Sequence, residues 1–149
     1  MSLHDEFLDL AERLLKAAPS TDDNADLRRA VSSAYYGLFH RLISEAVCLF
    51  TPDVAIRNKI ARSFEHSEMK DAAAAVSQSQ WPKSITSVPG LKIVAQDLVD
   101  VAKTFVDLQE RRHVADYVRQ PTPPLKKKDC EELVKRTRDA FEACDRLQR

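Results

Sequence analysis

Glycine is scarce in this chain, with 2 residues in 149, whereas average usage would supply about 10. Hairpin turns, phosphate-binding loops and dinucleotide-binding turns use glycine for backbone conformations with positive φ. The scarcity therefore argues against a β-rich fold, a P-loop and a G-x-G-x-x-G fingerprint.

Long apolar runs and paired cysteines are missing too. No segment approaches the ~18 apolar residues that span a bilayer, and the acidic segment 1–15 lacks the basic start and apolar run of a signal peptide. Cys48, Cys130 and Cys144 include no C-x-x-C pair, and the last two fall on one predicted helix, roughly 21 Å apart and too far to bridge. We therefore expect reduced thiols, a cytoplasmic location and no membrane contact.

Segments rich in helix-breaking residues divide the chain into five helical stretches. They leave a first helix that carries Leu3 to Ala17, followed by helices at about 25–50, 53–79, 91–119 and 129–148. Ser2 with Asp5 resembles a capping box, and Thr51–Pro52 resembles the start of the third helix. We expect one domain, 1–149, which buries roughly 70% of its unfolded surface without a disulfide or metal.

Apolar residues repeat along four stretches with a period near 3.5 residues. They stand at Leu3, Phe7, Leu10, Leu14 and Ala17 in the first helix, Leu27, Val31, Ala34, Tyr35 and Leu38 in the second, Leu98, Val101, Phe105 and Leu108 in the fourth, and Cys130, Val134, Thr137, Phe141 and Cys144 in the fifth. This period predicts an all-α, antiparallel up-and-down bundle of about five helices. The third stretch is less regular, and we expect it to break near His66.

Arg112 interrupts the apolar pattern of the fourth helix at a core position. Because an unpaired buried charge is strongly disfavoured, Arg112 needs a partner, and Asp116 one turn later can supply it. Arg112, His113, Asp116 and Tyr117 then form a polar patch at the helix end. The alternative is that the helix leaves the bundle here and Arg112 reaches out to water.

A polar stripe follows the second helix. Arg29, Ser33, Tyr36 and His40 recur at intervals of four, three and four residues beside the apolar face. The stripe is either part of a site or a solvated face with a half-buried tyrosine. Gly37 inside this helix lowers helix stability by about 1 kcal/mol relative to alanine, which predicts a close approach of another helix.

Two histidine motifs resemble metal sites incompletely. Glu110 and His113 have the Glu-x-x-His spacing of di-iron bundles, which need a second copy and two further glutamates. His66 and Glu68 match half of the zinc-deaminase signature, but no P-C-x-x-C follows. We therefore expect no metal or cofactor, and we place His4 and His66 at the surface.

The zero formal net charge hides an asymmetry. Residues 1–110 hold 12 basic and 16 acidic side chains, whereas residues 111–149 hold 11 basic and 7 acidic ones. The basic residues around the end of the fourth helix are Arg111, Arg112, Arg119, Lys126, Lys127 and Lys128. Such a surface attracts phosphates and predicts a nucleic-acid contact, although lysine runs also occur in plain solvated loops.

Two segments together resemble those of HEPN-domain proteins. The segment from Arg28 to His40 is similar to the R-x-x-S-x-A-Y-Y-x-x-F-H helix of that superfamily, and the segment from Arg111 to Tyr117 is similar to the R-x-x-A-D-Y segment of one branch. HEPN domains are small helical bundles, commonly dimeric. Many are metal-independent ribonucleases of toxin–antitoxin, defence or RNA-processing systems, and some work beside a nucleotidyltransferase.

The ribonuclease motif of that superfamily is R-x(4–6)-H, often with a polar residue after the arginine. Arg112 takes the arginine position and His113 the polar one, but Tyr117 stands where the essential histidine is expected. Cleavage through a ribose 2′-hydroxyl needs groups with a pKa near neutrality, and tyrosine reaches that range only when strongly shifted. An altered pair would use His113 or His40.

The resemblance implies a homodimeric binding or regulatory module. It would engage an RNA or nucleotide phosphate, or a partner protein such as a nucleotidyltransferase or an antitoxin. Arg112 would contact the anion, Asp116 would orient the arginine, and Tyr117 would stack or hydrogen-bond. Two alternatives stay open: a metal-independent endoribonuclease that uses Arg112 with His113 or His40, and a purely structural domain in which Arg112 and Asp116 fix the bundle register at a dimer seam.

Overall fold

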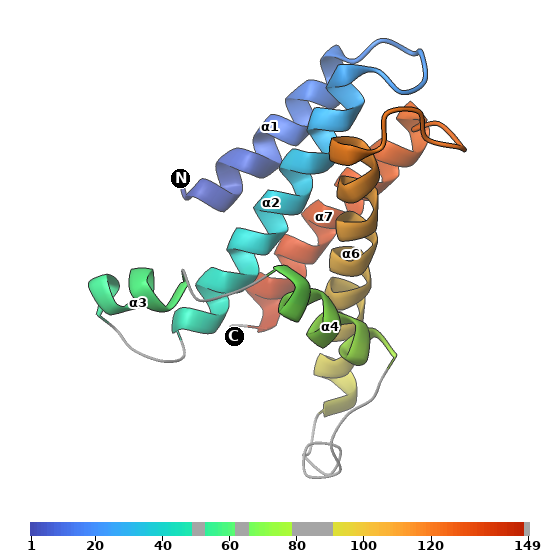
Figure 1. Ribbon diagram of the computed structural model, residues 1–149. Coiled ribbons are helices and arrows are strands. Elements are labelled where there is room, and N and C mark those ends of the chain that lie inside the picture. Colours follow the sequence, from blue (N-terminus) through green and yellow to red (C-terminus); the bar gives the residue numbers. More distant parts are fainter. Residues whose placement is uncertain (49–52, 62–65, 79–90, 148–149) are drawn as a thin grey trace.

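The computed structural model describes residues 1–48, 53–61, 66–78 and 91–147. Within these ranges all regular structure is helical (Figure 1): α1 (Leu3–Ala17), α2 (Ala25–Cys48), α3 (Val54–Ala61), α4 (His66–Ser77), α6 (Leu91–Tyr117) and α7 (Lys127–Leu147). Helix α1 packs along α2, α2 packs on α6 and α7, and α4 lies against α6. The predicted all-α bundle is confirmed.

The third predicted stretch forms two helices rather than one. Helix α4 begins at His66, where the sequence predicted a break. Helix α3 begins directly after Asp53, whose carboxylate accepts hydrogen bonds from the backbone N–H groups of Ala55 (2.9 Å) and Ile56 (3.2 Å). Asp53 therefore caps α3. The predicted start at Thr51–Pro52 lies outside the described residues.

The buried row of α1 is the neighbour of the predicted one. The buried residues of this region are Leu8, Ala11, Leu15 and Ala18, whereas Leu3 is 55% exposed and Phe7, Leu10 and Leu14 are only partly buried. Both rows are apolar and share the same period, so periodicity alone does not choose between them. On the other helices the predicted rows are largely buried, as at Leu27, Val31, Ala34, Leu38, Val101, Phe105, Leu108, Val134, Thr137 and Phe141.

Gly37 decides how closely α1 approaches α2. A Cβ atom at this position would lie 3.3 Å from the carbonyl oxygen of His4 and 3.4 Å from the backbone nitrogen of Leu8. The predicted close approach of another helix at Gly37 is confirmed, and α1 is the helix that approaches.

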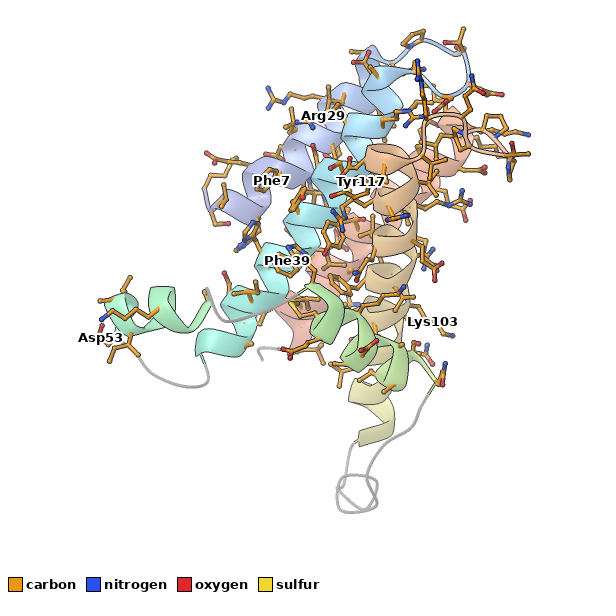
Figure 2. The ribbon with its side chains drawn as sticks, viewed as in Figure 1. Phe7, Arg29, Phe39, Asp53, Lys103 and Tyr117 are labelled. Atoms are coloured by element: carbon orange, nitrogen blue, oxygen red, sulfur yellow. The ribbon has the colours of Figure 1, made fainter. Side chains whose placement is uncertain are left out.

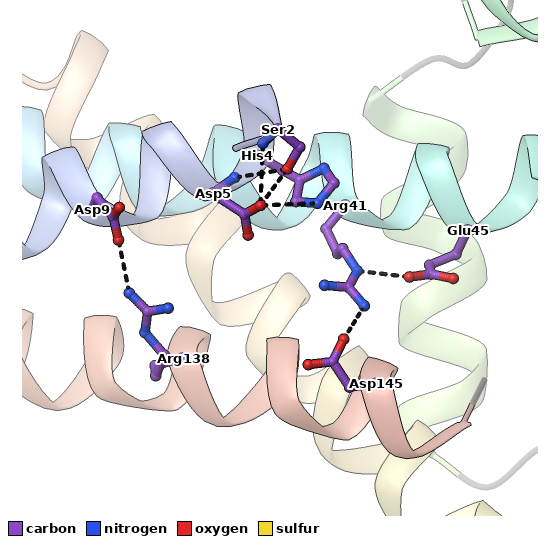
Figure 3. Close-up of polar contacts among 8 residues, drawn as sticks. All are labelled: Ser2, His4, Asp5, Asp9, Arg41, Glu45, Arg138 and Asp145. Carbon is purple, nitrogen blue, oxygen red and sulfur yellow. Dashed lines mark hydrogen bonds and ion pairs between the residues drawn. The ribbon is translucent and has the colours of Figure 1, made fainter. Parts of the chain in front are cut away.

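Ion pairs connect α7 to α1 and to α2, and a helix cap stabilises the start of α1 (Figure 3). Arg41 of α2 is 8% exposed and donates to Glu45 and to Asp145 of α7, both at 2.6 Å. Arg138 of α7 donates to Asp9 of α1 at 3.0 Å. The predicted capping box of α1 is also confirmed, since the Ser2 and Asp5 side chains each accept from the other's backbone N–H.

The described residues also bear on the thiols and on the membrane. Cys130 and Cys144 are buried free thiols, and the side chain of Cys48 lies outside the described part of the chain. No helix within the described ranges has both the length and the apolar character needed to cross a bilayer.

Candidate functional site

Arg28, at the start of α2, holds the end of α6. Its guanidinium donates to the carbonyl oxygens of Ala115 (2.9 Å), Val118 (2.8 Å) and Arg119 (3.1 Å). On the other side it pairs with both carboxylate oxygens of Asp23, at 2.8 and 3.0 Å. Carbonyl groups at a helix end lack intrahelical partners, so Arg28 satisfies them and joins the two elements.

The two segments singled out in the sequence therefore lie against each other. One turn beyond Arg28, the Ser32 hydroxyl donates to the Asp116 carboxylate at 3.3 Å. The same carboxylate lies 3.8 Å from Nη1 of Arg112. Asp116 thus links the buried face of α2 to the arginine of α6.

Arg112 packs on aromatic rings instead of extending into water. Its side chain is 13% exposed, and its guanidinium carbon lies 4.7 Å from the ring centroid of Tyr35, 6.0 Å from that of Tyr36 and 5.7 Å from that of Tyr117. Tyr117 is 66% exposed and lies at the end of α6 (Figure 2). Cation–π contacts compensate part of the desolvation of the guanidinium.

One edge of Arg112 remains unsatisfied. Its Nε atom is buried and has no hydrogen-bond partner in the described part of the chain, and the same holds for Oε1 of Gln109. A hollow of about 340 Å³ opens here, lined by Lys70 of α4 and by Gln109, Glu110, Arg112 and His113 of α6. Lys70, Arg112 and His113 carry hydrogen-bond donors suited to an anion, whereas the negative charge of Glu110 repels one.

His66 also belongs to this site, and its predicted surface position is wrong. Its Nδ1 atom forms a hydrogen bond with the Tyr35 hydroxyl, and its ring stacks on Phe39 with centroids 3.9 Å apart. Burial lowers the pKa of His66, and the Arg112 and His40 charges add to this effect. The sequence held no signal for this position, because only the docking of α4 brings His66 to α2. His4, also predicted at the surface, is partly buried as well, with a side chain 16% exposed.

Tyr35 is the centre of these contacts. It is fully buried, and burial raises the pKa of its hydroxyl to about 12, against a smaller lowering by Arg112. The phenol is therefore protonated at neutral pH. Sequence reasoning placed Tyr35 in the apolar row of α2 and did not assign it a role in the site.

The predicted histidines His113 and His40 take different places. His113 is exposed, and its ring centroid lies 5.3 Å from that of Tyr117, at the hollow beside Arg112. His40 instead stacks on Phe7 of α1, with centroids 5.7 Å apart. Burial, with a smaller contribution from His4, lowers the pKa of His40. The structure thus brings His113, and not His40, to the hollow.

The polar stripe of α2 is not a uniform solvated face. Arg29 is exposed and Ser33 is buried, whereas Tyr36 and His40 are partly buried. Tyr36 contacts the Arg112 site, since its ring lies edge-on to His66 with centroids 6.2 Å apart. Only the middle of the stripe therefore contributes to the site.

The predicted basic surface is divided between two faces of α6. Arg112 faces α2 and α4, whereas Arg111 lies in a hollow on the α7 side that also holds Asp129 and Glu132. The remaining basic residues that are exposed are Arg119, Lys126 and Lys128.

Lys127 has a structural partner. Its Nζ atom donates to the carbonyl oxygen of Ala18, directly after α1, at 2.8 Å. The hydrogen bond ties the start of α7 to the end of α1. One of the three N–H donors of its ammonium is therefore engaged within the chain, and its role as a phosphate contact stays a prediction.

The Glu-x-x-His pair does not form part of a cluster of ligands. Within the described ranges, no three His, Cys, Asp or Glu side chains come together as metal ligands would. Comparisons with protein-family models, with curated proteins and with solved structures found no match for this chain. The interpretation of the site therefore rests on its own geometry.

Proposed function

We propose that this bundle is a HEPN-like binding module that holds a phosphate of RNA or of a nucleotide at Arg112. We place it as a cytoplasmic homodimer in a toxin–antitoxin, defence or nucleotidyltransferase-associated system. The observation that carries the proposal is the hollow at which Lys70, Arg112 and His113 come together. The system itself rests on the resemblance of the two segments described above.

The chemistry of these side chains suits a phosphate group. Arginine binds phosphate oxygens through a planar fork, and lysine adds a compact charge. The Tyr35 ring and the Asp116 carboxylate already hold Arg112, so less side-chain entropy is lost when an anion binds. Glu110 at the rim repels anions, and we therefore expect a small number of phosphate contacts.

Fluorescence anisotropy with a labelled single-stranded RNA oligonucleotide tests the proposal. Arg112→Met removes the anion contact and keeps the side-chain volume, so we expect an affinity loss of about tenfold or more. Arg13→Ala is the matched control, because it removes the same charge from an exposed position on α1. Two contacts, from Arg112 and Lys70, predict a slope of roughly −1.4 for log affinity against log salt.

Two further results decide the outcome. Lys126→Gln with Lys128→Gln removes exposed charges and should weaken binding less than Arg112→Met does. Equal RNA affinity of the wild-type protein and Arg112→Met, at low and high salt, would overturn the proposal. A nucleotidyltransferase or antitoxin protein would then be the partner to test.

The ribonuclease alternative is favoured by one observation, the presence of His113 at the hollow beside Arg112. The same RNA incubated in EDTA tests it. Cleavage that both Arg112→Met and His113→Ala abolish would establish a metal-independent endoribonuclease. Intact RNA, bound by the wild-type protein, supports the binding module.

The proposed homodimer has support in α3. Val54 is 66% exposed and Ile56 is 47% exposed, and among the described helices α3 packs chiefly on α2. Light scattering after size-exclusion chromatography should give twice the chain mass of 16.9 kDa. Val54→Ser with Ile56→Ser should lower that mass, and a monomeric wild-type protein would contradict the proposal.

A further inference from the structure

The hydrogen bond between Tyr35 and His66 determines which nitrogen of the imidazole carries a proton. Tyr35 is fully buried, and within the described residues its hydroxyl has one hydrogen-bond partner, Nδ1 of His66. A buried phenol left without an acceptor is strongly disfavoured. The Tyr35 hydroxyl must therefore donate, and Nδ1 must accept.

The surroundings keep this imidazole neutral. The Arg112 cation lies against the same two tyrosine rings that His66 contacts, and Phe39 covers one face of the imidazole. A second positive charge here would lie in an apolar site close to the first. Neutral His66 with an accepting Nδ1 carries its proton on Nε2.

His66 lies beside two of the residues that line the hollow, Lys70 and Arg112. It precedes Lys70 by one turn of α4, so the two side chains lie on the same face of that helix. Lys70 lines the hollow together with Arg112, and α4 packs against α6. In the described part of the chain, the hydrogen bond of His66 runs through Nδ1, and none is formed by Nε2.

We propose that His66 is a further ligand-binding residue of the Arg112 site, and that its Nε2–H donates a hydrogen bond to a phosphate oxygen of the bound RNA or nucleotide. This inference rests on the proposed function. It assigns the imidazole a neutral donor role, and with Nε2 protonated His66 does not serve as the base that would remove a 2′-hydroxyl proton. His66 is then a residue that holds a phosphodiester, and it is assigned no part in cleavage.

Two substitutions of His66 separate the two ring nitrogens. His66→Asn keeps an acceptor near the Nδ1 position for the Tyr35 hydroxyl but lacks the Nε2 donor, so we expect it to fold and to bind the labelled RNA about tenfold more weakly. His66→Gln restores a donor near the Nε2 position and should bind within about threefold of the wild-type protein. Thermal melting of each variant verifies folding, and His40→Gln is the histidine control.

The outcomes distinguish this inference from the proposed function. If Arg112→Met loses RNA affinity and His66→Asn does not, the role of His66 is overturned while the Arg112 site stands. If neither variant changes the affinity, the proposed function fails. Two-bond ¹H–¹⁵N spectra at neutral pH add a readout without RNA: they should show the Nε2–H form of His66, and the Nδ1–H form or an imidazolium would overturn the inference.

Discussion

The guanidinium of Arg28 donates to the carbonyl oxygen of Ala115 at 2.9 Å, so that the first turn of α2 closes the last turn of α6. The neighbouring Arg29 is exposed. The two arginines are adjacent in the chain, yet only Arg28 is bonded to backbone and carboxylate oxygens of other elements. This pair gives a matched test of what holds α2 to α6.

Arg28→Ala should lower the free energy of unfolding by about 2–4 kcal/mol, because several charge-assisted hydrogen bonds disappear and the helix-end carbonyl groups lose their donor. Arg29→Ala should change it by less than about 0.5 kcal/mol, as expected for an exposed side chain. Urea denaturation of both variants makes the measurement. Equal effects of the two substitutions would show that Arg28 does not tie the helices together.

Arg112→Met separates structure from binding. The substitution removes cation–π contacts and an ion pair at 3.8 Å, but it also removes a buried Nε that has no partner. Since these effects are each worth about 1–2 kcal/mol and oppose one another, we expect the free energy of unfolding to change by less than about 1 kcal/mol. Arg112→Ala should be less stable, because it leaves a cavity.

Urea denaturation again measures the difference. A loss well above about 2 kcal/mol in Arg112→Met would contradict the expectation that a buried ion pair can be replaced by an apolar side chain without loss of stability. An unchanged stability together with lost RNA affinity would assign Arg112 to binding.

Tyr35 predicts how stability changes at alkaline pH. Burial raises the pKa of this hydroxyl from 10.0 to about 12 in the folded protein. A raised folded pKa gives stability that is fully present below pH 10 and is lost as the pH rises towards 12, because the unfolded chain releases the proton first. The full effect corresponds to about 2–3 kcal/mol.

Tyr35→Phe lacks this titration. Its free energy of unfolding should therefore fall less steeply between pH 10 and 12 than that of the wild-type protein, and the difference between the two proteins should shrink over that range. Urea denaturation at several alkaline pH values checks this. Parallel profiles of the two proteins would contradict the protonated, buried phenol.

The sequence correctly predicted those features that depend on residue spacing within a single helix. The capping box at Ser2, the close approach at Gly37 and the core position of Arg112 each follow from spacing within a single helix, and the structure has all three. The buried row of α1 was missed because both of its rows are apolar, so only the partner helix selects between Leu3 and Leu8.

The sequence did not predict the contacts between helices that lie far apart in the chain. The sequence singled out His66 only as half of an incomplete zinc signature, and its contact with Tyr35 of α2 exists because α4 packs against α6. In the same way, the sequence did not predict that Lys127, one of three consecutive lysines, donates a hydrogen bond to the backbone at the end of α1. A charge count treats Lys126 and Lys127 alike, although only the second has a partner among the described residues.

Gly37→Val tests the packing of α1 on α2. Even a single Cβ would lie 3.3 Å from the carbonyl oxygen of His4, and this neighbour is backbone, which yields only if α1 moves. Valine adds two further methyl groups, so we expect the free energy of unfolding to fall by about 1–3 kcal/mol despite the loss of a helix-interior glycine. Arg29→Val is the control, because it introduces the same side chain at an exposed position of α2. Ala30→Val would be less informative, because it also crowds a core position. A stability of Gly37→Val equal to that of Arg29→Val would mean that α1 is free to adjust, and that the short distance at Gly37 does not hold the two helices in place.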